Sequence, residues 1–245
     1  MSGLCTQNAF ILTEMKTLKP ILALLAFAAP AGAATAILNP TSIQYLNAVS
    51  QELGGLDNET NLIDGSGLSA APTIGNYQSV THAAVSFGPT NAWVTTDPGG
   101  YPSDFFAAGG LPQAFGISLG GLFSVESVVV WGYHFGNANG NSASQLSLDF
   151  SVDGGLSFVS SVSGLVVNTN AVVGGAAEAT FGVVNANFIR ANFTDNHFDP
   201  SNAGAGGDRL GIAEIRFTGG EPIPEPGSAL LAGLGLIAAS LRRRR

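Results

Sequence analysis

Residues 146–152 read Leu-Ser-Leu-Asp-Phe-Ser-Val, and every second side chain in this stretch is apolar. Successive side chains of a β-strand point to opposite faces, so a period of two predicts a strand with one buried and one solvated face. The same alternation recurs at residues 189–193 and 213–217. Apolar stretches bounded by Gly, Asn, Asp and Pro predict further strands at residues 80–87, 93–96, 114–119, 124–134, 158–162 and 179–184.

Short strands separated by turns are typical of an antiparallel all-β protein, and we expect a jelly-roll β-sandwich. The run Val128–Trp131 is apolar on both faces, which predicts a covered central strand and places Trp131 in the core. Asp153-Gly154 predicts a hairpin turn. A helix is predicted only over residues 41–53, where three apolar residues would share a face: Ile43, Leu46 and Val49.

The charge of the predicted β domain, residues 37–220, differs from that of the whole chain of 245 residues, which carries −8. The domain has fourteen acidic residues, no Lys, and three basic residues (Arg190, Arg209 and Arg216), so its net charge is 3 − 14 = −11. This charge disfavours nucleic acid and anionic membrane surfaces as partners. The one Cys, Cys5, lies outside the domain, which excludes a disulfide framework and Cys-based zinc or thiol chemistry within it.

The N-terminal region, residues 1–36, has the pattern of a secretory signal peptide. Lys16 and Lys19 precede an apolar run at residues 21–29, and small residues at A-x-A spacing follow. The apolar run is too short to span a bilayer, so we expect a signal helix removed by signal peptidase after Ala33, Ala34 or Ala36. Met15 is the better start of this signal, because a start at Met1 would place fourteen further residues before the basic region.

The C-terminal region, residues 221–245, combines a Pro-rich stretch, an apolar segment and a basic end. The apolar segment at residues 228–241 predicts a short transmembrane helix about 21 Å long at ~1.5 Å per residue. The Arg cluster would remain cytoplasmic, so the chain before the helix would lie outside. The residues of this motif are Pro224, Glu225, Pro226, Arg242, Arg243, Arg244 and Arg245.

This tail resembles the PEP-CTERM sorting signal, which has the same three parts in the same order. The resemblance implies export by a Gram-negative bacterium that makes extracellular polysaccharide, and processing by an exosortase at the inner membrane. We then expect the processed protein at the cell surface or in the extracellular matrix, with a role in the biofilm. An ordinary single-span anchor is the alternative.

The segment from residue 61 to residue 217 resembles the discoidin, or coagulation factor 5/8 type C, domain with its galactose-binding-like fold. The matching pieces are an Asn-x-x-Asp-Gly loop at residues 61–65, a strand ending in Leu-Gly at 119–120, an Asp-Gly turn at 153–154, an x-x-Arg strand at 188–190 and a closing Glu-Ile strand at 214–215. The chain departs from the family in the long gap between Asp64 and Trp93 and in lacking the usual Cys pair.

The resemblance also implies a structural Ca²⁺ between the Asp-Gly loop and the closing Glu. Carried over to this chain, the ligands would be Asn61, Asp64, Ser66 and Glu214. Hard cations prefer such oxygen ligands. The alternative is that Asp64-Gly65 is a simple turn and that Glu214 is an exposed strand residue.

Sugar binding needs an aromatic platform and a few planar polar groups, because pyranose faces stack and hydroxyls pair with donors and acceptors. The loop candidates for a glycan site are Trp93, Tyr101, His134, His197 and Arg209. The polar-aromatic run at residues 195–199 is the strongest loop among them.

Catalysis is not expected, because no metalloprotease His pair and no phosphate-binding glycine loop occurs in the sequence. The sequence therefore predicts an exported, non-catalytic β-sandwich module that binds extracellular polysaccharide or a protein partner. The alternatives are a purely structural surface protein with no specific ligand and, third, a glycan-active enzyme.

Overall fold

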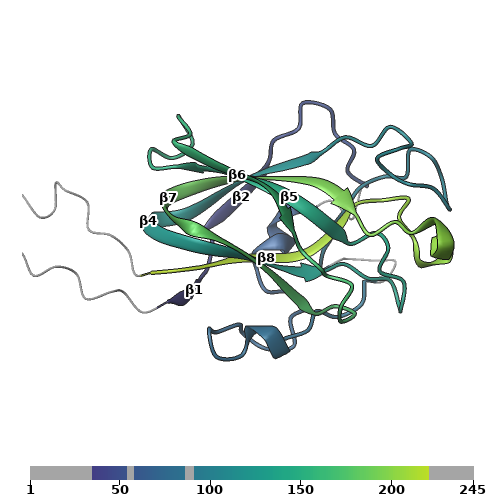
Figure 1. Cartoon of the computed structure of the whole chain (residues 1–245), viewed down its shortest axis with the longest axis horizontal. Coiled ribbons are helices and arrows are strands. Elements are labelled where there is room, and N and C mark those ends of the chain that lie inside the picture. The colour runs from purple at the N-terminus through teal and green to yellow at the C-terminus, as the bar shows by residue number, and fades with distance from the viewer. Residues whose placement is uncertain (1–34, 54–57, 86–90, 221–245) are drawn as a thin grey trace, which may run out of the picture. The chain divides into compact units, whose positions relative to one another are not determined.

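The computed structural model describes residues 35–53, 58–85 and 91–220 of the chain, and within them it has an all-β antiparallel architecture (Figure 1). The predicted signal helix and the predicted C-terminal helix lie outside the described residues. Among the described residues, no helix is long and apolar enough to cross a membrane. The predicted boundary at residue 36 falls on the first residue of β1 (Ala36–Leu38).

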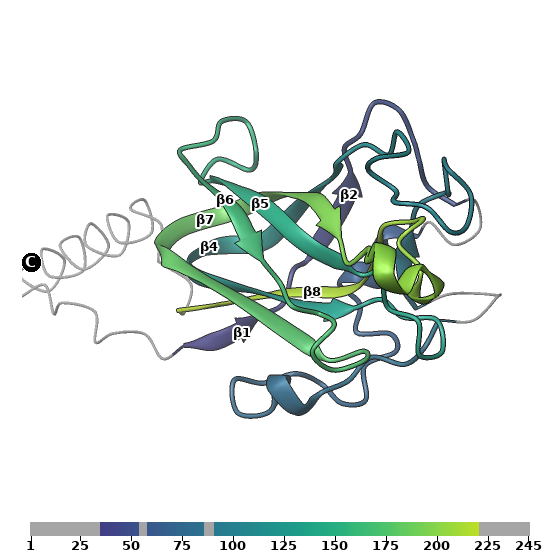
Figure 2. The same cartoon turned by 45° about the vertical axis from the view of Figure 1, so that its right-hand side comes forward.

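Two very long strands, β4 (Gln113–Gly132) and β7 (Ala176–Asn196), run through both layers of a β-sandwich. The first half of β4 and the second half of β7 pair with each other in one layer. That layer is completed by β2 (Ser42–Tyr45) beside β4, and by β5 (Ala143–Ser151) and β6 (Ser160–Val166) beyond β7. Figure 2 shows these strands side by side.

The other layer is built on the remaining halves of the same two strands. There β4 lies between β7 and β8 (Gly211–Gly219). The outer edge of β8 pairs with β1 near Gly219 and with the short β3 (Trp93–Val94) near Gly211. The register between β4 and β7 shifts between Ser118 and Phe123, at the point where the chain passes from one layer to the other.

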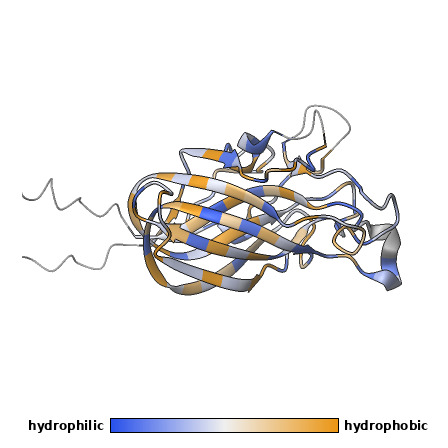
Figure 3. Cartoon of the chain, turned by 90° about the horizontal axis from the view of Figure 1, so that it is seen from above, coloured by the Kyte–Doolittle hydropathy of each residue, from blue (hydrophilic) through white to orange (hydrophobic). Residues whose placement is uncertain are grey.

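The main core lies between the two layers. Leu146, Leu148 and Phe150 of β5 and Ile212, Ile215 and Phe217 of β8 are buried in one hydrophobic cluster, which joins opposite layers. The predicted alternation supplies Leu146, Leu148 and Phe150 of β5 and Ile215 and Phe217 of β8 to this core, whereas Val152 is exposed and Ala213 lies in a second core. Figure 3 shows bands of hydrophobic and hydrophilic residues along the strands. The predicted jelly-roll β-sandwich is thus confirmed.

A second, smaller core covers the outer face of the β8 layer. The segment at residues 63–85, which includes a short 3-10 turn at Tyr77–Ser79, packs Tyr77, Val80 and Val85 onto Val129 and Trp131. The indole nitrogen of Trp131 donates a hydrogen bond to the Val80 carbonyl oxygen over 2.9 Å. The prediction that Trp131 is a core residue on a covered strand is therefore confirmed.

Three sequence predictions about secondary structure are wrong. The expected helix at residues 41–53 is absent, and β2 pairs with β4 in its place. Residues 80–85 form no regular strand but only isolated bridges, because this segment covers the β8 layer. The pairs of strands predicted within 114–134 and within 179–193 are each one continuous strand, β4 and β7.

The predicted turn at Asp153-Gly154 is present. Gly154 has a φ of +76°, a left-handed conformation that glycine adopts without strain. The Asp153 carboxylate accepts hydrogen bonds from the Ser151 hydroxyl and the Ser157 amide. These hydrogen bonds lower the pKa of Asp153 to about 2 and fix the connection between β5 and β6.

Candidate functional site

The loops that precede β4, β5 and β8 gather at one end of the sandwich, which we call the loop end. It comprises residues 95–112 after β3, residues 133–142 after β4 and residues 197–210 after β7. These loops meet because Ala143 of β5 pairs with Asn196 of β7, while Gly132 of β4 and Val94 of β3 pair with the start of β8. A short 3-10 segment, Pro200–Ala205, lies in the last loop.

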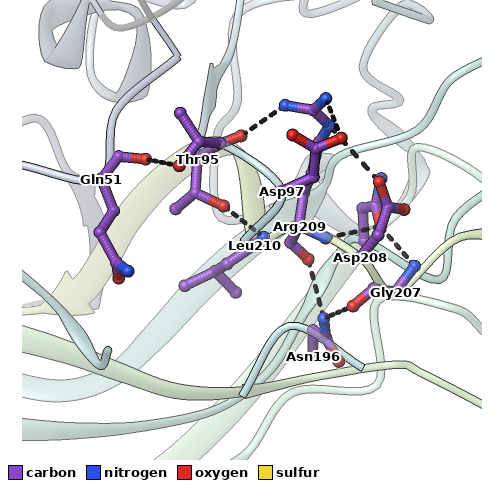
Figure 4. Close-up of polar contacts among 10 residues, drawn as sticks. Gln51, Thr95, Asp97, Asn196, Gly207, Asp208, Arg209 and Leu210 are labelled. Atoms are coloured by element: carbon purple, nitrogen blue, oxygen red, sulfur yellow. Dashed lines mark hydrogen bonds and ion pairs between the residues drawn. The ribbon is translucent and has the colours of Figure 1, made fainter. Parts of the chain in front are cut away.

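Arg209 is the central side chain of the loop end (Figure 4). Its Nη2 atom is 3.0 Å from the Asp97 Oδ2 atom, and its Nη1 atom donates a hydrogen bond to the Thr95 carbonyl oxygen over 3.0 Å. Its Nε atom is 3.6 Å from Asp208 Oδ2. The Arg209 side chain is 23% exposed and that of Asp97 is 38% exposed. The guanidinium is therefore held in one orientation at the surface, with a carboxylate beside it.

Two asparagine side chains hold the backbone that carries Arg209. The Asn196 amide donates hydrogen bonds to the carbonyl oxygens of Gly207 and Arg209, each over 2.8 Å (Figure 4). The Asn141 side-chain oxygen accepts from the Gly207 amide and, over 3.3 Å, from the Arg209 amide. Gly207 has a φ of +118°, and a Cβ atom there would lie 2.4 Å from the Phe198 ring. The loop is thus built around a required glycine, which keeps Arg209 in place.

Besides Phe135, which is 44% exposed, the loop end presents Tyr101, an aromatic side chain with an exposed fraction of 63%. It follows Asp97 across a turn in which the Gly100 amide donates a hydrogen bond to the Asp97 carbonyl oxygen over 3.1 Å. The turn therefore links the exposed ring to the carboxylate that pairs with Arg209.

His197 lies in the same group of loops but is partly buried. Its backbone amide donates a hydrogen bond to the Ser142 carbonyl oxygen over 3.1 Å, and its Nε2 atom is buried without a hydrogen-bond partner among the described residues. Burial lowers the pKa of His197, so its ring is neutral at pH 7. His197 thus belongs to the loop end as a neutral, largely covered ring.

Two residues predicted for the glycan site are structural, because they are buried. Trp93 is fully buried and contacts Phe115 edge-on, with 4.9 Å between the ring centroids, while its indole nitrogen donates to Glu52. His134 is 7% exposed, and its ring nitrogens lie 2.8 Å and 3.0 Å from the backbone oxygens of Gly136 and His82. Neither ring presents a face to a sugar.

The predicted calcium ligands lie near one another, but a guanidinium takes the place expected for the cation. Glu214 is fully buried, accepts a hydrogen bond from the Gly65 amide over 3.1 Å and forms an ion pair with Arg216. Asn61 is buried and donates to the Ala92 carbonyl oxygen, and Asp64 accepts from the Ser66 amide. Within residues 35–53, 58–85 and 91–220, no three acidic, His or Cys side chains group closely enough to hold a metal ion. The arrangement does not fit the predicted ligand set.

The sequence interpretation missed several residues that shape the loop end. Asp97 and Asn141 are ordinary loop residues in the sequence, and only the fold brings them to Arg209. Asp208 precedes Arg209 directly and Asn196 lies in the run at residues 195–199, but neither was named as a site residue. The Asp97-Pro98-Gly99 turn signal was present but carried no functional information. Chemically, the loop end offers an oriented donor, a carboxylate acceptor and an exposed aromatic ring.

Comparison with known proteins confirms the sorting tail. Residues 222–245 match the model of the PEP-CTERM protein-sorting motif. These residues contain the predicted motif from Pro224 to Arg245. No curated protein matches the chain.

Solved structures that are similar to the chain have low sequence identity. The family 32 carbohydrate-binding module of C. perfringens NanJ, in complex with galactose, is 16% identical, with a TM-score of 0.43 over 76% of this chain and 99% of that chain. The C-terminal domain of a chitobiase from Bacteroides fragilis is 15% identical, with a TM-score of 0.45 over 77% and 99%. The lectin domain of lectinolysin, complexed with Lewis B antigen, is 14% identical, with a TM-score of 0.41 over 72% and 90%.

Proposed function

We propose that this chain is an exported, non-catalytic module that is sorted by its PEP-CTERM tail and binds neutral extracellular polysaccharide at its loop end. The observation that carries the proposal is the Arg209 guanidinium, fixed by Thr95 and Asp97 at the surface and linked through one turn to the exposed Tyr101 ring. Such a set of planar polar groups and an aromatic face suits a sugar ring.

The charge of the domain supports a neutral ligand. With −11 over residues 37–220 and no Lys, an acidic polymer would be repelled over most of the surface. A neutral polysaccharide meets no such repulsion, and its hydroxyl groups pair with both Asp97 and Arg209.

The position of the loop end supports display on a surface. Gly219, next to the sorting tail, pairs with Ala36 of β1, whereas Arg209 precedes the opposite end of β8. A strand of nine residues spans about 30 Å. If the C-terminal tail holds the domain during processing, the loop end lies on the side of the domain away from the tail.

The test is retardation of the purified full-length chain in a native gel that contains the host's own polysaccharide. We expect retardation of the wild type and its loss in Tyr101→Ala and Asp97→Asn, which change exposed groups. Leu156→Ala is the control, because Leu156 is 90% exposed in the β5–β6 turn, at the other end of the sandwich. Equal retardation of all variants would overturn the loop-end site, and no retardation of the wild type would favour a purely structural surface protein.

A further inference from the structure

We propose that the domain has a second saccharide site, separate from the loop end, in a pocket on the outer side of β8. This Arg216 pocket has a volume of about 460 Å³, which is in the range of pockets that hold small ligands. Its polar lining is Asn39, Asp64 and Arg216, and its apolar lining includes Leu68, Ala71 and Pro72. We infer that it takes one neutral sugar unit.

The donor of the pocket is a buried guanidinium with unused capacity. Arg216 is 4% exposed, yet it lines the pocket. Its Nη1 atom donates to the Ile215 carbonyl oxygen and pairs with Glu214, while its Nε atom is buried without a hydrogen-bond partner among the described residues. The Nε atom is covered by protein, so a ligand hydroxyl in the pocket would accept from the Nη2 atom, which makes no hydrogen bond among the described residues.

The guanidinium is held firmly enough to act as part of a site. Glu214 forms an ion pair with the guanidinium, and the Gly65 amide donates a 3.1 Å hydrogen bond to the Glu214 carboxylate. Gly65 has a φ of +76° and no side chain, and its Cβ position would lie 3.8 Å from the Arg216 Nη2 atom. Because Gly65 has no side chain, the Asp64-Gly65 turn does not cover the Arg216 guanidinium.

The acceptor of the pocket is Asp64. Its Oδ1 atom accepts a hydrogen bond from the Ser66 amide over 2.7 Å, whereas its Oδ2 atom has no hydrogen bond among the described residues. Asp64 is exposed, as is Asn39, which has both a donor and an acceptor. Donor and acceptor groups that line one small pocket match the paired donor and acceptor character of sugar hydroxyls.

The charges of the pocket favour a neutral ligand over an acid. Asp64 is at its rim, and the surrounding domain is strongly acidic, so a carboxylate ligand would gain from Arg216 but would be repelled by Asp64. A neutral hexose avoids that repulsion, and its C–H face would lie against the apolar wall at residues 68–72.

The experiment is equilibrium dialysis of the full-length chain, in a detergent without a sugar headgroup, against labelled galactose, glucose and galacturonate. We expect at least one neutral hexose to bind at two sites per chain. Ala71→Trp should remove one of them, because Ala71 is exposed and its larger side chain would fill the pocket. Val183→Trp is the matched control, at an exposed position on β7.

Asp64→Asn keeps the shape of the side chain and removes one acceptor charge, so it should weaken the same site by about tenfold or more. Tyr101→Ala should leave the pocket site intact, so that failure of the pocket and failure of the loop end are distinguishable. The inference is overturned if Ala71→Trp and Val183→Trp bind with the same stoichiometry, if galacturonate binds the pocket better than the hexoses, or if the wild type binds none of the sugars.

Discussion

At the scale of single residues, Glu214 and Arg216 show how the β8 layer places charge inside the protein. They lie two residues apart on one face of β8, and the segment at residues 63–85 covers that face. Burial raises the pKa of Glu214 to about 8, and the negative charge of Asp64 acts in the same direction, although Arg216 and the Gly65 amide act against it. The folded protein therefore binds the Glu214 proton more tightly than the unfolded chain does, and the ion pair with Arg216 forms as this proton is lost.

This difference predicts that stability falls as the pH rises. The ordinary pKa of the Glu214 carboxyl is 4.5, so the contribution to stability is fully present below pH 4.5 and is lost between there and about pH 8. Urea unfolding of the wild type and of Glu214→Gln over this range should show a steeper loss of unfolding free energy in the wild type. Glutamine cannot titrate, and the other groups are common to both chains. Parallel curves would contradict the prediction.

Gly219 is a second residue at which the structure makes a sharp demand. A Cβ atom there would lie 1.9 Å from the Ser124 backbone oxygen, which cannot move as a flexible side chain would. At Gly182, on β7, a Cβ atom would have nothing within 4 Å.

We therefore expect Gly219→Ala to lower the unfolding free energy by about 1–3 kcal/mol. The matched variant Gly182→Ala should change it by less than about 0.5 kcal/mol. Chemical denaturation of the two variants against the wild type measures both. The prediction is wrong if the two substitutions have equal effects.

At the scale of elements, β3 is a strand of only two residues that nevertheless fixes a large side chain. It pairs with the start of β8 and inserts Trp93 against Tyr45 and Phe115. The element thus joins the β8 layer to the aromatic residues of β2 and β4.

Trp93→Ala should accordingly lower the unfolding free energy by about 3–5 kcal/mol, as expected for a buried Trp. Trp93→Phe should retain polysaccharide retardation in the native gel, because the residue supports the core and presents no face to a ligand. Loss of retardation in a Trp93→Phe chain with unchanged melting temperature would show a direct role in binding.

The same scale shows what sequence reasoning could and could not predict. Alternation predicted both strands, β5 and β8, because each has one face in the main core, but it did not predict that the other face of β8 is buried as well. It failed for β2, because the spacing of Ile43, Leu46 and Val49 is also that of one face of a helix. Only the pairing of β2 with β4 shows that the segment contains a strand. The predicted strand at residues 114–119 stops before Gly120, although β4 continues through it, and the interval between the predicted strands at residues 179–184 and 189–193 also belongs to β7. Arg209 was identified from its loop, but its partners are brought by the fold. Arg216 was interpreted as solvated because the covering segment at residues 63–85 has no sequence signature.

At the scale of the whole molecule, the distribution of charge predicts how binding responds to salt. The domain carries −11, so binding of an acidic polymer would strengthen as added salt screens the repulsion. Binding of a neutral polysaccharide should change by less than about twofold between low and high salt. Native gels run at two ionic strengths compare the two cases. A strong increase in retardation with salt would contradict a neutral ligand.

The placement of β8 has a mechanical consequence for a chain held at one end by its tail and at the other by a polymer. Tension between the loop end and Gly219 would run along β8, which is flanked on one side by β4 and on the other by β1 and β3. Force along a strand loads its interstrand hydrogen bonds in shear, so they must break together and not one after another. This geometry makes β8 resistant to tension applied between the loop end and Gly219.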